Sequence, residues 1–245
     1  MALPKINTPI FELTLSSTGE SVKYRPFLMK EQKILLLALE SGETKSIMTA
    51  VKQIINNCVV GDIDVEKLPV FDLEYFFMRL RGKSIGETVD LQLRHPTGLN
   101  SKDEECQHVT KFTFNIMEVE VEKTITHTDK IIIDEETGLG IKLKYPTADF
   151  TEMDTDNLSQ LDVAVKMLIS CIDYIYDKEE IYKKEDSSSL ELQEFVDSLS
   201  QEQFKTVMNF FETMPKLKHT INWKCTGCGC DDEVTLEGMG NFFAL

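Results

Sequence analysis

The residues best suited to chemistry lie in one short stretch near the end of the chain, from Trp223 to Cys230. Cys225 and Cys228 have the two-residue spacing of a zinc knuckle, in which a tight turn directs two thiolates at one metal ion. Glycines on both sides of Cys228 give the backbone the conformational freedom that such a turn needs. Because a tetrahedral zinc site takes about four ligands, this turn supplies half of a site.

The other half of the site is predicted more than a hundred residues earlier, where the only other cluster of cysteine and histidine lies. It stands at the end of two strand-like runs, Thr88–Arg94 and Val109–Ile116. The predicted metal ligands are Cys225, Cys228, Cys106 and His95, with His108 and Cys230 as substitutes, and the predicted ion is zinc. If both turns bind the same ion, the two halves of a zinc ribbon are separated in the sequence by the residues of most of a domain.

Two other interpretations of the cysteine turn stay open at this point. The thiols could simply be packed within a hairpin turn, or they could form a redox pair, since C-x-x-C is also the dithiol spacing. A redox pair normally stands at the start of a helix inside a βαβ unit. Here the residues on both sides of the turn, 219–224 and 233–237, alternate between polar and apolar, which predicts strands.

Size and charge exclude several classes of protein. The 245 residues are enough for one large domain or two small ones. A formal net charge of −16 argues against binding to nucleic acid or to an anionic membrane surface, because phosphate would be repelled. No apolar run approaches the roughly 18–20 residues of a membrane span, so no membrane insertion is expected. Six cysteines in a chain of this length do not make a disulfide scaffold, and they suggest a reducing cytoplasm.

The hydrophobic pattern predicts an α+β protein in which helices pack against a mostly antiparallel sheet that carries the zinc-ribbon-like pair of hairpins. One or two compact units are expected overall. Helices are predicted over 28–40, 44–58, 69–82, 158–172, 190–199 and 200–213. The four predicted segments are 1–83 with a hairpin and helices, 84–146 with antiparallel strands, 147–215 with helices, and 216–245 with the cysteine hairpin and an apolar tail.

Local signatures of catalysis are missing from the sequence. It contains no P-loop, Rossmann glycine fingerprint, nucleophile elbow or H-E-x-x-H helix. Four histidines are few for acid–base chemistry, and the carboxylates stand in charged runs rather than alone within apolar strands. The sequence therefore predicts a protein that is not an enzyme and has no catalytic residues.

Several stretches together resemble a viral protein family. They are the opening residues 1–15, residues 22–40, Arg79–Gly86, Leu143–Pro146 and the closing Cys-x-x-Cys followed by Gly-x-x-x-Phe-Phe. The chain resembles the baseplate hub subunit family of T-even-like contractile-tailed bacteriophages, including those that infect cyanobacteria. In that family the middle hairpin often carries cysteine at the place of His95.

The resemblance implies a structural component of the baseplate hub, whose partners are other hub, wedge or tail-tube proteins. It would assemble in the host cytoplasm and, if retained, lie in the tail baseplate of the virion. One alternative is a hub-assembly chaperone that is absent from the mature virion, and a second is a zinc- or dithiol-dependent protein. The segments expected to contact partners are 176–189, the tail 238–245 and the loop 95–106.

Overall fold

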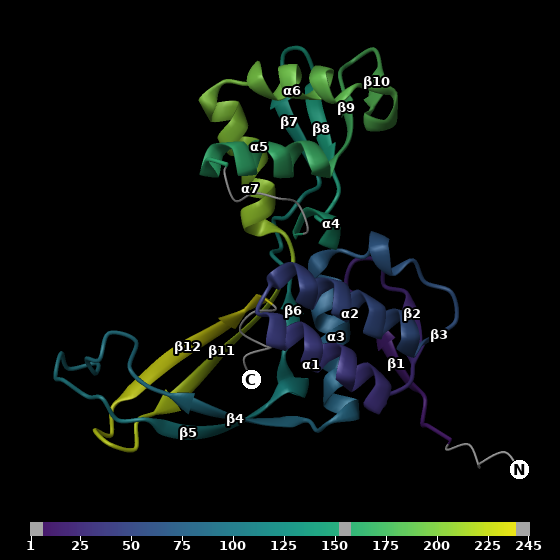
Figure 1. Cartoon of the computed structure of the whole chain (residues 1–245). Helices are drawn as coiled ribbons and strands as arrows, with labels where there is room; N and C mark the ends of the chain where they lie inside the picture. Colours follow the sequence, from purple (N-terminus) through teal and green to yellow (C-terminus); the bar gives the residue numbers. More distant parts are fainter. Residues whose placement is uncertain (1–6, 152–157, 239–245) are drawn as a thin grey trace, which may run out of the picture. The chain divides into compact units, whose positions relative to one another are not determined.

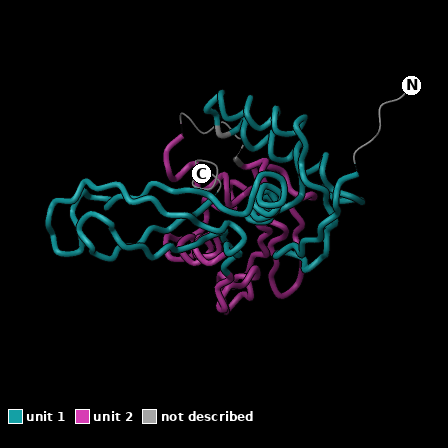
Figure 2. Tube along the Cα trace, turned by 90° about the horizontal axis from the view of Figure 1, so that it is seen from below, with its two compact units in different colours: residues 1–122, 216–245 teal, residues 123–215 magenta. Residues whose placement is uncertain are grey.

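The computed structural model describes residues 7–151 and 158–238 (Figure 1). These residues pack into two compact units, one formed by residues 1–122 and 216–245 and the other by residues 123–215 (Figure 2). The chain therefore leaves the first unit after residue 122 and returns to it at residue 216. The division into four segments stays a prediction. Among the described residues, no helix has the length and apolar character required to cross a membrane.

Both units combine helices with antiparallel strands, which confirms the predicted α+β class. In unit 1, a three-stranded sheet of order β1-β2-β3 stands beside three helices. The elements are β1 (Phe11–Thr14), β2 (Ser21–Tyr24), β3 (Val59–Val60), α1 (Met29–Ser41), α2 (Thr44–Cys58), the short 3-10 helix η1 (Val65–Lys67) and α3 (Val70–Ser84).

Helix α3 is the centre of unit 1, and almost every side chain along it is buried. It begins directly after Pro69, whose fixed φ suits the start of a helix. Asp72 is fully buried and accepts hydrogen bonds from the backbone N–H groups of Ser16 and Ser17, which tie the first hairpin to the helix. Arg79 donates to the carbonyl oxygen of Val119 at 2.9 Å, and so joins the helix to a segment 40 residues further along the chain.

Two long hairpins complete unit 1 and lie side by side in both views (Figures 1 and 2). One is β4 (Thr88–Leu93) with β5 (Thr110–Asn115), and the other is β11 (Lys216–Lys224) with β12 (Asp231–Glu237). After the 3-10 turn η2 (Ile116–Glu118), β6 (Glu120–Glu122) pairs with β11, giving a sheet of order β12-β11-β6. The rings of Phe114 and His219 pack together with centroids 5.0 Å apart, so the two hairpins touch along their length as well as at their tips.

Unit 2 is a four-stranded antiparallel sheet of order β10-β9-β8-β7 with helices packed on it. The sequence predicted no strand at β9 or at β10, and β10 falls in a charged stretch that begins at Asp177. The elements are β7 (Lys130–Asp134), β8 (Leu139–Leu143), α4 (Ala148–Thr151), α5 (Gln160–Cys171), β9 (Ile172–Tyr176), β10 (Ile181–Lys183), the 3-10 helix η3 (Lys184–Asp186), α6 (Ser189–Asp197) and α7 (Gln201–Thr213). Its core combines Ile131, Ile141, Leu143, Leu168, Ile172, Leu192, Val207 and Phe210.

Serine begins three helices of unit 2 through reciprocal caps. Ser200 accepts a hydrogen bond from the backbone N–H of Gln203, and Gln203 accepts one from the backbone N–H of Ser200. Ser159 and Ser188 form the same capping box at the starts of α5 and α6. Each box satisfies two backbone N–H groups that have no partner within the helix, which stabilises the helix start by about 1 kcal/mol.

Glu31, at the start of α1, is a charged group whose contribution to stability depends on pH. Its side chain is fully buried and accepts hydrogen bonds from Arg25 Nη2 at 3.0 Å and from the backbone N–H of Leu28 at 2.9 Å. Burial alone would raise the pKa of Glu31, but these bonds outweigh it and hold the pKa below its usual value. A lowered folded pKa gives stability that is present above the unfolded pKa and is lost as the pH falls through the folded value.

We therefore expect Glu31→Gln to lower the free energy of unfolding at pH 7 by about 1–3 kcal/mol, because Arg25 loses its charged partner. The difference between the two proteins should shrink as the pH falls from 7 towards 3, since the native carboxylate is then protonated as well. Urea unfolding of both proteins across this pH range measures it. A difference that stays constant with pH would contradict the assignment of a charged Glu31.

Candidate metal centre

The cysteine turn joins β11 to β12 and is closed by its own backbone. The N–H of Cys225 donates to the carbonyl oxygen of Cys230, and the N–H of Gly229 donates to that of Cys225, both at 2.9 Å. Gly229 has a φ of +74°, in the left-handed region that favours glycine. At Gly227, a Cβ atom would lie 2.6 Å from the Cβ of His108, so only glycine lets the β4–β5 loop approach this turn.

The loop between β4 and β5 holds its own shape through Asn100, which is 5% exposed. Asn100 Oδ1 accepts hydrogen bonds from the backbone N–H groups of Lys102 and Glu104. At the base of the loop, Gly98 N–H donates to the carbonyl oxygen of His95 at 3.0 Å, and Cys106 N–H donates to that of Gly98 at 2.7 Å. This ladder brings His95 and Cys106 close together although ten residues separate them.

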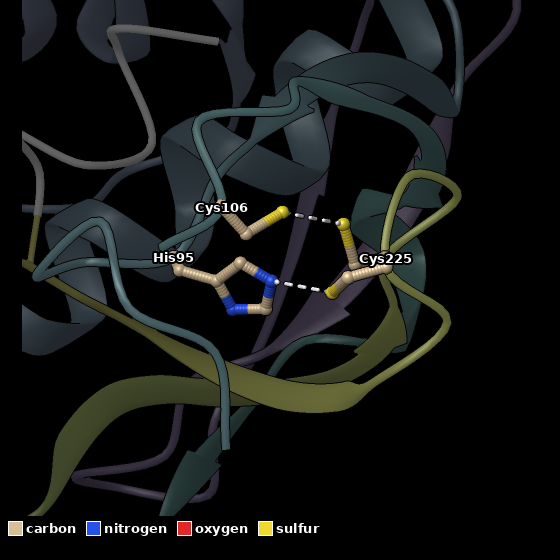
Figure 3. A group of neighbouring side chains, drawn as sticks. His95, Cys106 and Cys225 are labelled. Atoms are coloured by element: carbon tan, nitrogen blue, oxygen red, sulfur yellow. Dashed lines mark hydrogen bonds between the residues drawn. The ribbon is translucent and has the colours of Figure 1, made fainter. Parts of the chain in front are cut away.

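The two turns meet, and the side chains of His95, Cys106, Cys225 and Cys228 converge on one point. Their ligand atoms all lie within 4.8 Å of one another. Figure 3 shows the thiol of Cys106 facing that of Cys225, from hairpins far apart in the sequence. These are the four ligands predicted first from the sequence, and their role as metal ligands stays a prediction.

Two ligand-to-ligand distances in this cluster match those of a tetrahedral zinc site. The Sγ atoms of Cys106 and Cys225 are 3.8 Å apart, and Cys228 Sγ lies 3.4 Å from His95 Nε2. Zinc bonds of about 2.3 Å to sulfur and about 2.0 Å to nitrogen place tetrahedral ligands about 3.8 Å apart for two sulfurs and about 3.5 Å for sulfur and nitrogen. The donor set fits a zinc ion with little movement, and all four positions would be filled by protein, as in structural sites.

His95 is held in the orientation that a metal ligand needs. Its ring is 1% exposed, and Nδ1 lies 2.6 Å from Asp232 Oδ2 on the neighbouring strand. A proton on Nδ1 shared with this carboxylate leaves the Nε2 lone pair for the metal ion, the usual carboxylate–histidine–zinc arrangement. The ring of Trp223 packs against the imidazole with centroids 5.2 Å apart and further restricts its rotation.

The backbone around the thiols favours their ionised forms. The N–H groups of Cys228 and Gly227 lower the pKa of Cys225 to about 5, and the N–H of Cys230 lowers the pKa of Cys228. The N–H of His108 acts on Cys106 in the same direction, but burial and the neighbouring cysteines outweigh it, so the pKa of Cys106 is raised. Asp232 raises the pKa of His95 to about 9. The lowered pKa of Cys225 favours its thiolate, the form in which cysteine binds zinc.

The two substitute ligands lie outside the converging group. His108 is exposed, and its Nε2 lies 2.9 Å from Thr226 Oγ1. Cys230 is 6% exposed, and its sulfur lies 4.0 Å from the carbonyl oxygen of Cys228. Both residues stabilise the turn without directing a donor atom at the centre of the cluster.

Asp232 and Trp223 are parts of this site that were not predicted as such from the sequence. Asp232 stands in the acidic run 231–233, and nothing in its sequence context distinguishes it from its neighbours. The strand register distinguishes Asp232 from its neighbours, because Trp223 and Asp232 are opposite each other in the β11–β12 pair. Directly paired residues share one face of a sheet, so both side chains reach His95.

Comparison with known proteins identifies the family. The family model described as "T4 bacteriophage base plate protein" matches residues 8–244, almost the full length of the chain. The chain belongs to this base plate protein family. The match includes both units and all four residues of the cysteine–histidine cluster, and it confirms the resemblance to a baseplate family of T4-like phages. No curated protein and no solved structure gives a significant match to this chain.

Proposed function

We propose that this base plate protein is a structural component of the baseplate hub, acting in baseplate assembly through contacts with other hub, wedge or tail-tube proteins. The observation that carries the proposal is the family match over residues 8–244. The acidic charge of −16 and the lack of catalytic motifs also favour a protein that works by docking rather than by chemistry. Assembly would take place in the host cytoplasm, and the retained chain would lie in the tail baseplate of the virion.

The segment 176–189 has the surface features of a docking region in unit 2. Strand β10 is an edge strand of its sheet, and Ile181 and Tyr182 on it are 63% and 44% exposed. A groove of about 810 Å³ runs beside it, lined by residues that include Tyr174, Ile181, Lys183, Lys184 and Leu192. An open strand edge beside exposed apolar side chains is a common place for a partner's extended segment to bind.

The other two predicted contact segments differ in what the structure describes. In the loop 95–106, residues 101–105 are exposed, and they stand on a base held by His95 and Cys106. Residues 239–245 of the tail lie outside the described residues. Both segments remain proposed contacts.

We also infer that the cysteine–histidine cluster holds a structural zinc ion that joins the two hairpins of unit 1. The four-ligand geometry supports it, as do the carboxylate behind His95 and the burial of Cys225, which is 1% exposed. The dithiol alternative fits less well, because a redox pair must reach another protein's thiols and this sulfur is covered.

The hub component and the assembly chaperone differ in whether the chain stays in the particle. In tails purified from infected cells, we expect quantitative mass spectrometry to detect the chain in a fixed ratio to other hub proteins. Partly assembled hubs that lack wedges should contain it in the same ratio, because a hub subunit joins before the wedges attach. Its presence in hub intermediates together with its absence from finished tails would overturn the structural role and favour the chaperone.

A further inference from the structure

Helix α1 presents an apolar stripe to solvent on the side opposite its buried face. The buried side consists of Glu31, Leu35 and Ala38. On the opposite side, Met29 is 65% exposed, Leu36 is 50% exposed and Leu37 is 68% exposed. Seven and eight residues, about two helical turns, separate Met29 from the two leucines, so all three lie on one side of the helix. In unit 1, α1 has α2 as its neighbour (Figure 1).

Two charges in the same stripe have no counterpart on their own helix. Lys33 and Glu40 are both exposed and lie three or four residues from the apolar residues, so they share the same side of the helix. No opposite charge stands three or four residues away from either of them, where a helical ion pair would form. Their order is also unfavourable for the helix dipole, since the basic residue comes first and the acidic residue lies in the last turn, which has no basic residue.

This pattern is complementary to itself when two copies of the helix run antiparallel. The midpoint between Leu36 and Leu37 is also the midpoint between Lys33 and Glu40 in the sequence. At 1.5 Å per residue, each charge lies about 5 Å from that point along the axis, in opposite directions. A two-fold axis through this point therefore brings Lys33 of each copy to the same height along the helix axis as Glu40 of the other copy. This gives two equivalent Lys33–Glu40 pairs, and Leu36 and Leu37 of both copies lie between them.

We infer that α1 is a self-association surface, at which a second copy of this chain docks its own α1 in antiparallel orientation. Charge complementarity selects the second copy, because a two-fold pairing supplies both missing ion pairs and opposes the two helix dipoles. One pair of 13-residue helices buries less than the roughly 1,200 Å² of a stable interface. The dimer is therefore weak in dilute solution and gains population where an assembly concentrates the chain. This inference goes beyond the proposed function and does not depend on it.

The test is sedimentation equilibrium of the purified full-length chain, with charge reversals on α1. The wild-type chain forms a monomer–dimer equilibrium, and Lys33→Glu raises the dimer Kd on the order of tenfold, because the introduced carboxylate then meets Glu40 of the other copy at two symmetric places. Glu40→Lys has the same effect. The double variant Lys33→Glu/Glu40→Lys restores the opposite charges and returns the Kd to about the wild-type value.

Leucine variants test the apolar part of the surface. Leu36→Asp raises the Kd by about a hundredfold or more, since it buries two charges at the centre of the pair. Leu190→Asp on α6 is the control, because Leu190 is an exposed leucine on a helix, as Leu36 is, with exposed fractions of 68% and 50%. It leaves the Kd unchanged. Circular dichroism and the melting temperature confirm that each variant is folded. A wild-type chain that is monomeric at several hundred micromolar, a dimer insensitive to Leu36→Asp, or a double charge reversal without recovery would each overturn the inference.

Discussion

Replacing Cys225 with serine is expected to abolish zinc binding and to remove from unit 1 the stabilisation that the bound ion supplies. Cys225 and Cys106 are 119 residues apart in the sequence, so an ion between them closes a long loop that includes all of unit 2. An ion that binds only the folded state stabilises it by about 4 kcal/mol when its free concentration is a thousandfold above its Kd. A serine hydroxyl is a poor substitute for a thiolate at zinc, so the variant forfeits this stabilisation.

The measurement is urea unfolding of wild type and Cys225→Ser, each with and without a zinc chelator. The chelator should lower the stability of the wild type to about that of the variant, and it should leave the variant unchanged. Cys230→Ser is the matched control, since this cysteine belongs to the same turn but lies outside the converging group. If Cys230→Ser lost as much stability as Cys225→Ser and became equally insensitive to chelator, the proposed set of ligands would be wrong.

Removing the carboxylate behind His95 should weaken zinc binding while leaving all four ligands in place. We expect Asp232→Asn to raise the Kd for zinc by roughly 10–100-fold, the usual effect of losing such a partner. The reason is geometric and electrostatic: the bond of 2.6 Å from Asp232 to Nδ1 directs Nε2 at the cluster and makes it a better donor.

The affinity of each variant follows from competition with a chromophoric zinc chelator. Asp231→Asn is the matched control, because Asp231 is the neighbouring acidic residue of the same strand, is exposed, and does not contact His95 within the described structure. In the metal-free state Asp232→Asn should be the less stable of the two variants, because it also removes the carboxylate that pairs with buried His95, so the comparison rests on the zinc affinities. Equal zinc affinities for the two variants would show that Asp232 has no part in positioning the ligand.

The helices and hairpins of this fold follow from local patterns in the sequence. Residues 44–58 and 69–82 have apolar side chains at three- and four-residue spacing, and the structure has helices at Thr44–Cys58 and Val70–Ser84. Strand Thr88–Leu93 shows the alternation of a half-buried strand. The β9–β10 hairpin was not predicted, because its apolar residues are interrupted by the charged turn 177–180, which is typical of a loop.

Long-range pairing could not be predicted in the same way. The pairing of β6 with β11, with Leu217 opposite Val121, depends on tertiary packing rather than on local propensity.

The candidate site could likewise be predicted only in part. The spacing of Cys225 and Cys228 marks half of it, but the other half rests on a loose cluster around Cys106, from which His95 was predicted as the ligand and His108 as its substitute. The shape of the β4–β5 loop determines which histidine joins the cluster, because it directs His95 inward and leaves His108 against Thr226.

We propose that one metal ion joins the two hairpins of unit 1 through His95, Cys106, Cys225 and Cys228. The decisive measurement is elemental analysis of the full-length protein, purified without chelator. We expect about one zinc per chain in the wild type and in Cys230→Ser, and none in Cys225→Ser. A wild-type protein that contains no zinc, and takes up none when zinc is added at neutral pH, would contradict it and leave the hairpins held by side-chain packing alone.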